Sequence, residues 1–417
     1  MLRNLLAALA LGFSLVPGVA SSDQSTAQAT SQSLLPDTDG SLQQVVISAN
    51  SARQSALRNV ELISNIVNAL PASAKIYIIV NDRDAFIVAR NPWPERIQFI
   101  ELPFSNPITI WTQDPFLVLH QPAAPQQVTL LASKEFERAG DALMAEKIAD
   151  VAGYELKQSA LYFEGGNVVS DNDFVFIGAN TIRYNALELQ ISEIDVVLDF
   201  QKELGRRVLV IGPFPQPVAH IDMMLTPLGH KRVAVADANA GIRIAEQALT
   251  NDPESVANFE QFCEDNFFGH PSIKNLLGSE GQKITAPQVL GKTRDMIELS
   301  RNVAPVLDGI ADSLKEYGYR VDRIPFLFGG PESRNAPDVE TGMQATYPML
   351  TYNNVLLEQD EGRHRVYLPL YGWPAMDEAA ASAWQRIGFE PRSIDGLTIS
   401  AMYGGALRCS VKVLEKK

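Results

Sequence analysis

The chain of 417 residues has only two cysteines, Cys263 and Cys409, which excludes a disulfide-rich framework and leaves one possible pair. Basic residues are also few, because 35 Lys and Arg stand against 49 Asp and Glu for a net charge of −14. This deficit argues against a nucleic-acid partner, since phosphate binding needs clustered Lys and Arg. An acidic surface suits a cationic substrate, although the same charge also serves solubility alone.

Long apolar runs are missing beyond the N-terminus, so no transmembrane helix is expected there. At the N-terminus, Arg3 is followed by the apolar run Leu5–Val16, which is too short to span a membrane. Gly18 and Ala20 place small residues at a signal-peptidase cleavage site, and no cysteine follows that would carry a lipid anchor. The sequence therefore predicts a signal peptide over residues 1–20 and a secreted or periplasmic protein without stable membrane insertion.

Patterning along the rest of the chain predicts one α/β domain. Residues 21–43 begin with a Ser-, Gln- and Thr-rich stretch that cannot bury much apolar area, so a flexible linker is expected. Over residues 44–417, short β-like runs such as Lys75–Val80 alternate with helical patterns, which indicates an α/β fold. The polar stretch at about residues 239–302 lacks strand patterning and is predicted to be a helical insertion.

Four short segments combine polar, chemically capable residues with glycines or strand ends. Each residue taken alone also fits an ordinary structural role. Asp114 fits a turn cap, and Glu164 fits a solvated residue of a tight turn. The segment of His220 and Asp222 equally fits a surface strand or a pair of metal ligands. A lone cysteine such as Cys409 is often a small buried hydrophobic residue. The segments are Trp111-Thr112-Gln113-Asp114-Pro115, Phe163-Glu164-Gly165-Gly166-Asn167, His220-Ile221-Asp222, and Gly404-Gly405 leading to Cys409.

A deiminase needs the residue types that these segments hold. A guanidinium is a planar cation with a pKa above ~12, and carboxylates bind it through paired hydrogen bonds. A thiolate can attack its central carbon, and a neighbouring cation lowers the pKa of the thiol. A histidine then protonates the departing ammonia and later activates water. The set in this chain is Asp114, Glu164, His220, Asp222 and Cys409.

The order of these segments resembles that of the guanidino-group-modifying superfamily, also called pentein enzymes. The superfamily includes arginine, agmatine and protein-arginine deiminases, dimethylarginine hydrolases and amidinotransferases. The resemblance implies a five-bladed pseudosymmetric α/β propeller and chemistry with no metal and no cofactor. Further segments that resemble the superfamily are Phe174–Gly178, Tyr352–Val355, Tyr367–Pro369 and Asp377–Ala379.

The resemblance also implies a role for each residue of the set. Cys409 would be the nucleophile, and His220 would be the acid and base. Asp114 and Asp222 would clamp the nitrogens of the guanidinium. Glu164 would orient His220 or join the clamp.

Four further residues are expected to contact or border the substrate. The Trp-x-Gln-Asp order is similar to that of protein-arginine deiminases, in which the Trp flanks the aliphatic stem of the substrate; for Trp111, ordinary core packing is the alternative. Gln113 stands in place of the Arg of free-amino-acid and agmatine enzymes, and Asn167 stands in place of an Asp. Arg408 stands in place of a His or Asn, where it would either lower the pKa of Cys409 or block a bulky substrate.

These observations predict an exported deiminase that hydrolyses a guanidinium to a ureido group and ammonia through a covalent thiouronium on Cys409. The substrate would be peptidyl arginine or an arginine-like small molecule, and export favours the peptide. An amidinotransferase with an amine as acceptor and a non-catalytic guanidino-binding protein are the alternatives. A metal-dependent hydrolase is disfavoured, because only His220 and Asp222 lie near each other in the sequence. A disulfide between Cys263 and Cys409 stays open and would switch the enzyme off.

Overall fold

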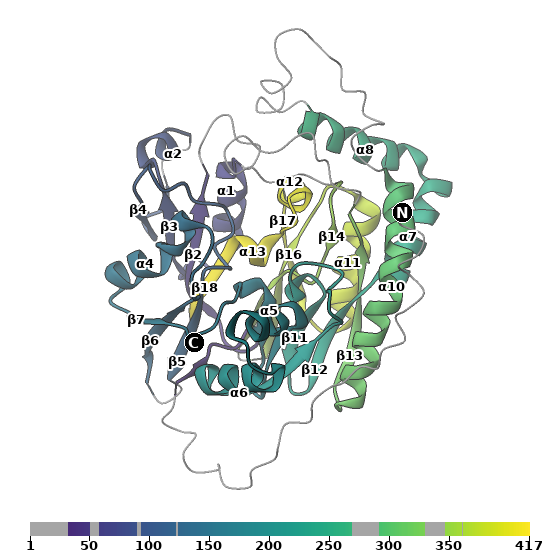
Figure 1. Cartoon of the computed structure of the whole chain (residues 1–417). Helices are drawn as coiled ribbons and strands as arrows, with labels where there is room; N and C mark the ends of the chain where they lie inside the picture. Colours follow the sequence, from purple (N-terminus) through teal and green to yellow (C-terminus); the bar gives the residue numbers. More distant parts are fainter. Residues whose placement is uncertain are drawn as a thin grey trace.

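The computed structural model describes residues 32–50, 58–89, 93–121, 124–268, 292–329, 347–360 and 362–417 (Figure 1). The predicted signal peptide over residues 1–20 and the first part of the predicted linker lie outside these ranges. None of the described helices combines the length and the hydropathy that crossing a membrane needs.

The described strands form five small sheets of three or four strands each. In spatial order, the sheets are β1 (Ser33–Leu34), β5 (Phe116–Gln121), β6 (Ala124–Ala132) and β7 (Glu155–Gln158); β10 (Arg207–Ile211), β9 (Phe174–Gly178) and β8 (Val168–Ser170); β11 (Leu225–Gly229), β12 (Arg232–Asp237), β13 (Arg320–Leu327) and β14 (Leu350–Thr351); β15 (Leu356–Asp360), β16 (Arg363–Pro369) and β17 (Glu390–Ile394); and β18 (Val411–Lys416), β2 (Leu42–Ala49), β3 (Lys75–Val80) and β4 (Ile97–Glu101).

One arrangement recurs in each of these five sheets. A strand pairs antiparallel with a second strand, and a helical connection leads from the second strand to a third that pairs parallel with it. Parallel neighbours need such a crossover, because a tight turn joins only antiparallel strands. The crossovers hold α1 (Val60–Ala69); α3 (Ala139–Ala142) and α4 (Met144–Ala152); α5 (Ala179–Leu189) and α6 (Glu193–Leu204); α7 (Ala238–Asn251), α8 (Pro253–Phe268) and α10 (Thr293–Glu316); and α11 (Pro374–Arg386).

The α/β class predicted from the sequence is confirmed by these mixed sheets and their helices. Among the described residues no sheet closes on itself, so the five-bladed propeller stays a prediction. Helix α2 (Arg83–Ala89) lies in a further crossover, between the parallel strands β3 and β4. Outside all crossovers lie α12 (Thr398–Met402), α13 (Leu407–Ser410) and the short 3-10 turns η2 (Gly165–Asn167) and η3 (Ile221–Met223).

Local sequence signals set several helix ends. Ser192 accepts a hydrogen bond from the backbone N–H of Asp195 at the start of α6, and Gly205 ends that helix in the left-handed conformation with a φ of 65°. Asp237 caps α7 in the same way through the N–H of Ala240. The central strands β3 and β12 are nearly continuous apolar runs, which is typical of strands covered on both faces.

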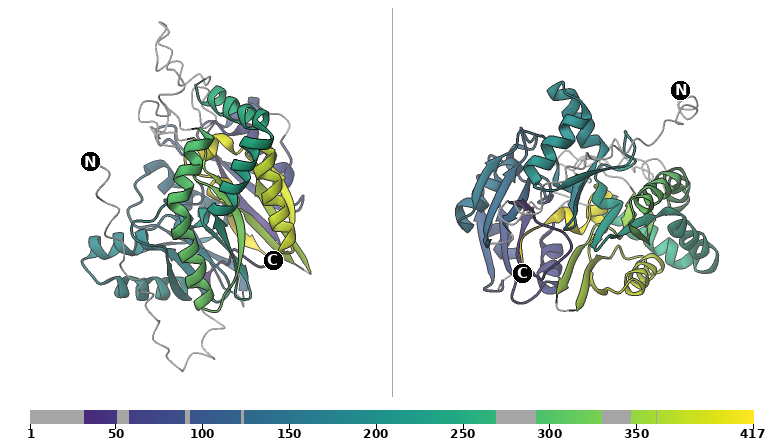
Figure 2. Two further views of the ribbon diagram at one scale, coloured as in Figure 1. Left: turned by 90° about the vertical axis from the view of Figure 1, so that its right-hand side faces the viewer. Right: turned by 90° about the horizontal axis from the view of Figure 1, so that it is seen from below.

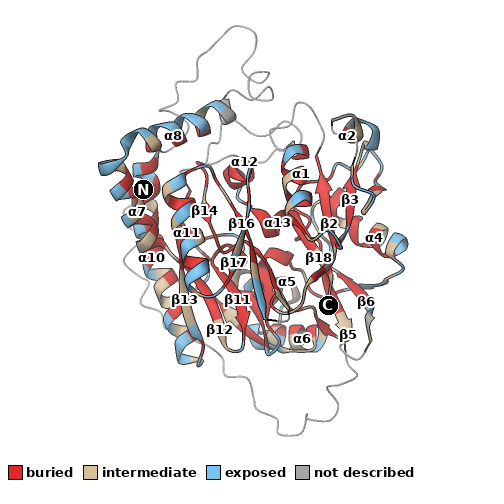
Figure 3. Ribbon diagram, turned by 180° about the vertical axis from the view of Figure 1, so that it is seen from behind, coloured by how far each residue is buried: buried red, intermediate tan, exposed pale blue. Residues whose placement is uncertain are grey.

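The two ends of the described chain meet in one sheet, because β18 pairs antiparallel with β2. Directly before β18 comes α13, which Figure 1 shows in yellow near the middle of the molecule. The view from below in Figure 2 shows the purple, teal, green and yellow segments placed around this middle. In Figure 3 the strands are mostly buried and the exposed surface lies largely on the helices, so the core is formed where helices cover the sheets.

The predicted linker over residues 21–43 is corrected for its described part. Ser33–Leu34 forms the edge strand β1, which pairs with β5, and Leu34 is buried. Asp37 forms an ion pair with Arg408 at the other end of the chain. This part of the segment is therefore built into the fold through backbone pairing, which its polar composition did not reveal.

The predicted insertion at about residues 239–302 is helical where it is described, but it belongs to a recurring unit. Its first and last helices, α7 and α10, pack against each other and against β13. They form the crossover between the parallel strands β12 and β13, and α10 extends beyond residue 302 to Glu316. The apolar faces of α7 and α10 cover this sheet, so the segment contributes to the core.

Candidate active site

The candidate site lies on five loops, one before the first strand of each recurring unit. This common position places the loops at the same end of their strands. The side chains concerned are Asp114 before β5, Glu164 before β8, His220 and Asp222 before β11, Asn354 before β15 and Cys409 before β18.

The structure brings the thiol, the imidazole and the carboxylates together. One ligand atom each of His220, Asp222 and Cys409 lies within 4.8 Å of the other two. Nε2 of His220 lies 2.9 Å from Oε2 of Glu164, and Nδ1 lies 3.9 Å from Oδ1 of Asp114. The five residues to which the sequence assigned catalysis therefore share one site, although most of the chain separates the first from the last.

The carboxylates around His220 favour its charged form. Burial lowers the pKa of His220, but the charge of Asp114, the hydrogen bond with Cys409 and the contact with Glu164 together raise it well above its ordinary value. Burial raises the pKa of Glu164, and its pairing with His220 and Arg138 more than reverses this effect. His220 is therefore an imidazolium at neutral pH and donates from Nε2 to Glu164.

The thiol of Cys409 is held in its protonated form. Burial and the charge of Asp222 raise the pKa of Cys409, and the opposing effect of His220 is smaller. Asn354 fixes the group from another side, since its Nδ2 donates to the sulfur at 3.3 Å and its Oδ1 accepts from the backbone N–H of Cys409 at 3.1 Å. Conversion of this thiol to a thiolate therefore needs additional positive charge in the site.

Asp114 and Asp222 each present a buried carboxylate oxygen, Oδ1, that has no hydrogen-bond partner among the described residues. The other oxygen of each group is held by an arginine: Oδ2 of Asp114 lies 2.7 Å from Arg138, and Oδ2 of Asp222 lies 2.9 Å from Arg408. A buried acceptor without a donor costs about 1–3 kcal/mol, more when it is charged. The two free oxygens therefore suit a ligand that is cationic and carries N–H donors.

Solved structures of similar shape were found at low sequence identity. A C. jejuni agmatine deiminase superposes with a TM-score of 0.59 at 13% identity, over 93% of this chain and 97% of that chain. A variant of the same enzyme with substrate bound gives a TM-score of 0.58 at 11% identity, over 93% and 97%. The agmatine deiminase of Enterococcus faecalis gives 0.58 at 14% identity, over 92% and 96%. This chain has the agmatine deiminase fold.

The resemblance to the guanidino-group-modifying superfamily, predicted from the order of the motifs, is thereby confirmed at the level of the fold. No protein-family model and no curated protein matches the sequence. At identities of 11–14% the shared property is the fold, so the chemistry of the site rests on the side chains themselves.

Within the agmatine deiminase fold, Arg408 has a different place from the one predicted. Its guanidinium is buried and donates to Asp37 and Asp222, and to the carbonyl oxygens of Gly165 and Val168. All its N–H donors are therefore used inside the protein, and none is left to contact a substrate. Because these carboxylates take up its charge, Arg408 does not lower the pKa of Cys409 below its ordinary value; it positions Asp222 instead.

Asn167 and Gln113 also act through the protein, in contrast to the predicted substrate contacts. The side chain of Asn167 donates to Thr181 and accepts from the backbone N–H of Ile221, next to His220. The side chain of Gln113 donates to the carbonyl oxygen of Gly165 at 3.2 Å. Both amides tie one site loop to another, so they position residues of the candidate site.

Two glycines allow aromatic rings to lie directly against the site loops. A Cβ at Gly166 would lie 2.3 Å from Nδ1 of His220, and a Cβ at Gly405 would lie 2.2 Å from the ring of Trp111. The first glycine therefore sets the position of the imidazole. Trp111 is buried against the loop that leads to Cys409, and this placement is compatible with its predicted position beside a substrate.

Three residues of the site were not identified from the sequence: Arg138, Asn354 and Asp37. Arg138 bridges Asp114 at 2.7 Å and Glu164 at 3.3 Å. It belongs to no motif, so no pattern pointed to it. Asn354 lies in a segment that was noted only for its resemblance, although its place before β15 matches that of the other site loops.

The metal and disulfide alternatives can be compared with the same geometry. Two groups of described residues have the composition of a metal site: His220, Asp222 and Cys409, and Asp114, Glu164 and His220. His220 contacts Glu164, and Arg138 pairs with both Asp114 and Glu164, so the members of the second group already have partners within the protein. Both cysteines are buried free thiols, so the described structure holds no bond between Cys263 and Cys409.

Proposed function

We propose that the protein hydrolyses a guanidino group to a ureido group and ammonia, with Cys409 as the nucleophile. The observation that supports this function best is the thiol within 4.8 Å of a charged imidazole and of a carboxylate that retains a free oxygen. The coarser conclusion, a protein that modifies guanidino groups, agrees with the fold of its structural neighbours.

Binding of the cation uses the two unpaired oxygens. The N–H groups of a planar guanidinium donate to Oδ1 of Asp114 and to Oδ1 of Asp222, as paired charge-assisted hydrogen bonds. These bonds satisfy the buried acceptors that are unsatisfied in the free protein. The central carbon of the guanidinium is thereby held beside the sulfur of Cys409, which lies within the same cluster as Asp222.

The bound cation also activates the nucleophile. In the free protein the charges of Asp222 and Asp114 raise the pKa of Cys409. A guanidinium that neutralises both carboxylates removes this effect and adds positive charge, so the pKa of the thiol falls and its proton is lost to solvent. The thiolate therefore forms when substrate is present to react with it.

In the first half of the reaction, the thiolate of Cys409 forms a bond to the guanidinium carbon. The carbon–nitrogen bond to one terminal nitrogen breaks as His220 gives that nitrogen a proton, and ammonia leaves. The products are a cationic thiouronium on Cys409 and a neutral His220. Glu164 keeps the ring oriented for this transfer through its 2.9 Å contact with Nε2.

In the second half, the neutral His220 takes a proton from water as the water oxygen attacks the thiouronium carbon. The carbon–sulfur bond then breaks, which restores the thiolate and leaves a ureido group. The remaining hydroxyl proton passes to solvent, where ammonia takes it up. An amidinotransferase would use an amine in place of water at this step.

Arg138 belongs to the ion pairs of the site itself. Its guanidinium pairs with Asp114, Asp141 and Glu164, so its charge is taken up inside the protein and does not select among substrates. The two free carboxylate oxygens recognise the guanidinium group that all candidate substrates share. We therefore propose an arginine-like guanidino compound, peptidyl or free, as the substrate class.

The function is tested by ammonia release from arginine, agmatine, methylarginines and arginine peptides, with and without an added amine acceptor. We expect the wild-type protein to release ammonia and Cys409→Ser to release none, while Cys263→Ser keeps full activity. A haloacetamidine should label Cys409 only, because its amidinium binds Asp114 and Asp222 and thereby lowers the pKa of Cys409, whereas burial raises the pKa of Cys263 with no such relief. Unchanged ammonia release by Cys409→Ser would exclude the mechanism. Transfer of the amidino group to the added amine would identify an amidinotransferase in place of a hydrolase.

Two further proposals concern architecture and location. We propose that the five sheets are the blades of a propeller whose loops meet at the site, which a crystal structure of the purified protein tests. We also propose export with cleavage after Ala20, for which N-terminal sequencing of the protein recovered outside the cytoplasm should begin at Ser21. A mature protein that still begins at Met1 would exclude this cleavage.

A further inference from the structure

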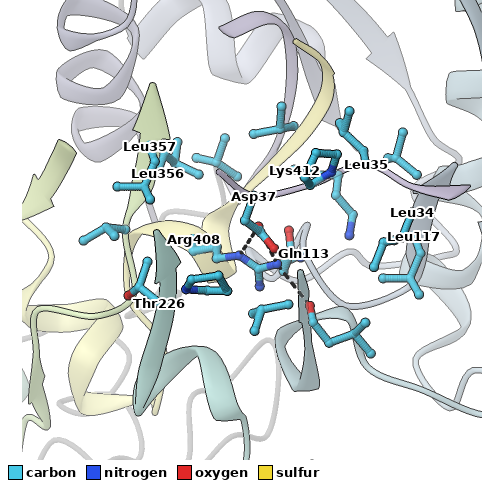
Figure 4. Close-up of a pocket in the computed structure, with 18 of the residues that line it drawn as sticks. Leu34, Leu35, Asp37, Gln113, Leu117, Thr226, Leu356, Leu357, Arg408 and Lys412 are labelled. Atoms are coloured by element: carbon cyan, nitrogen blue, oxygen red, sulfur yellow. Dashed lines mark hydrogen bonds and ion pairs between the residues drawn. The ribbon is translucent and has the colours of Figure 1, made fainter. Parts of the chain in front are cut away.

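A small cavity lies behind the candidate active site, on the far side of the loops that carry Asp114 and Glu164. Its volume is about 50 Å³, and one water molecule occupies ~30 Å³ in the liquid. Figure 4 shows Asp37, Gln113, Arg408 and Lys412 gathered around it, with leucines on the remaining walls. Lys416 completes the polar lining.

Lys412 is the one of these charged groups that has no hydrogen-bond partner among the described residues. Only 4% of the residue is exposed, and its ammonium makes no hydrogen bond or ion pair with any described residue. The ring of Phe116 lies beside this ammonium, with its centroid 5.2 Å from Nζ. A buried ammonium without a counter-charge is costly, so this position calls for a ligand or for loss of the proton.

The other charges around the cavity are already satisfied. Arg408 pairs with Asp37 and Asp222. The second oxygen of Asp37 accepts from the backbone N–H of Ser170 at 2.8 Å, and Lys416 donates to the carbonyl oxygens of Asp37 and Thr38. No described carboxylate forms an ion pair with Lys412, and Asp37, Asp114 and Asp222 act on its ammonium only through longer-range attraction.

We propose that this cavity binds a monovalent anion of about the size of chloride, held by the ammonium of Lys412. The volume admits an ion of this size. Burial and the charge of Arg408 lower the pKa of Lys412 to about 7 when the cavity holds no ion. A bound anion favours the charged lysine, so anion and proton bind together.

The position of the cavity links it to the site. A Cβ at Gly165 would lie 3.0 Å from Nζ of Lys412 and 2.0 Å from the carbonyl oxygen of Gln113, so the ammonium lies directly behind these two loops. Gly165 and Gln113 are the neighbours in sequence of Glu164 and Asp114. The anion therefore supports the backbone from which both carboxylates project, whichever reaction the site performs.

The direct test is a crystal structure of the wild-type protein grown in sodium bromide, with data collected at the bromine absorption edge. We expect an anomalous peak beside Nζ of Lys412. Density for water alone at saturating bromide would overturn the proposal and leave a neutral lysine in a hydrated cavity. This measurement needs no variant, so it stands even if substitution of Lys412 prevents folding.

The second test measures the folding equilibrium in sodium chloride and in sodium gluconate at equal ionic strength. For a dissociation constant of about 10 mM, raising chloride from about 10 to about 500 mM multiplies the folding constant of the wild-type protein by about 25. Lys412→Met should lose this chloride-specific increment, whereas Lys157→Met, at an exposed lysine, should keep it. Equal chloride dependence in wild type and Lys412→Met would overturn the proposal.

Discussion

Replacement of Gly166 by alanine tests whether this turn sets the position of the catalytic imidazole. The backbone at Gly166 is not in the left-handed region, so alanine itself is tolerated there. Its Cβ would lie 2.3 Å from Nδ1 and 2.8 Å from Cγ of His220, whereas ordinary contacts begin near 3.4 Å. The ring must therefore retreat by about 1 Å, which breaks its 2.9 Å contact with Glu164 and moves it away from Cys409.

A displacement of this size at a reacting group costs roughly 100-fold in rate, or about 2.7 kcal/mol. We expect kcat for ammonia release to fall by about this factor in Gly166→Ala, with a smaller change in KM, because the guanidinium clamp is intact. Gly241→Ala, on α7, is the matched control, because its Cβ would lie 1.9 Å from the carbonyl oxygen of Phe326. This variant should lower stability but keep the kcat of the folded protein. A wild-type kcat in folded Gly166→Ala would refute the reasoning.

Three further predictions concern charge. Because the pKa of Cys409 is raised, alkylation by iodoacetamide should be slow at neutral pH, and the midpoint of its pH–rate curve should lie above that of an ordinary thiol, about 8.5. Addition of a substrate analogue should lower this midpoint. A midpoint below about 8.5 in the free protein would contradict the prediction. Asp114→Asn should lower the pKa of His220, so the NMR titration of this ring should move to lower pH and the stability that the charged ring provides should be lost at a lower pH than in wild type. Arg408→Met should destabilise the protein by ~3–5 kcal/mol in urea unfolding, because it leaves buried carboxylates unpaired, whereas Arg183→Met, in an exposed pair, should cost less than ~1 kcal/mol.

The residues that meet in the candidate site could be predicted from the sequence because chemistry restricts them. Few residue types can attack or clamp a guanidinium, so the order of Asp114, Glu164, His220, Asp222 and Cys409 carried information even without coordinates. The structure brings these five together. The α/β class was also predictable, since apolar runs and helical patterns alternate along the chain.

The supporting groups could not be predicted in the same way. Arg408 and Asn167 were expected to face the substrate, because a side chain next to a reacting residue can point to either side of its loop and the sequence does not record which. Asp37 lay in a segment whose polar composition indicated a linker, yet one backbone ladder and one buried ion pair hold it in place. Arg138 contributes through long-range pairing alone, which leaves no local pattern.

The pairing of β18 with β2 has a consequence for the order in which activity appears. Backbone bonds between these strands, and the ion pair between Arg408 and Asp37, join residues about as distant as the chain permits. The sheet that follows Cys409 is thus completed only once the latest-synthesised strand reaches β2, and such non-local contacts form slowly. A polypeptide that lacks β18 or β2 cannot complete this sheet, so we expect it to be inactive even where its other units fold.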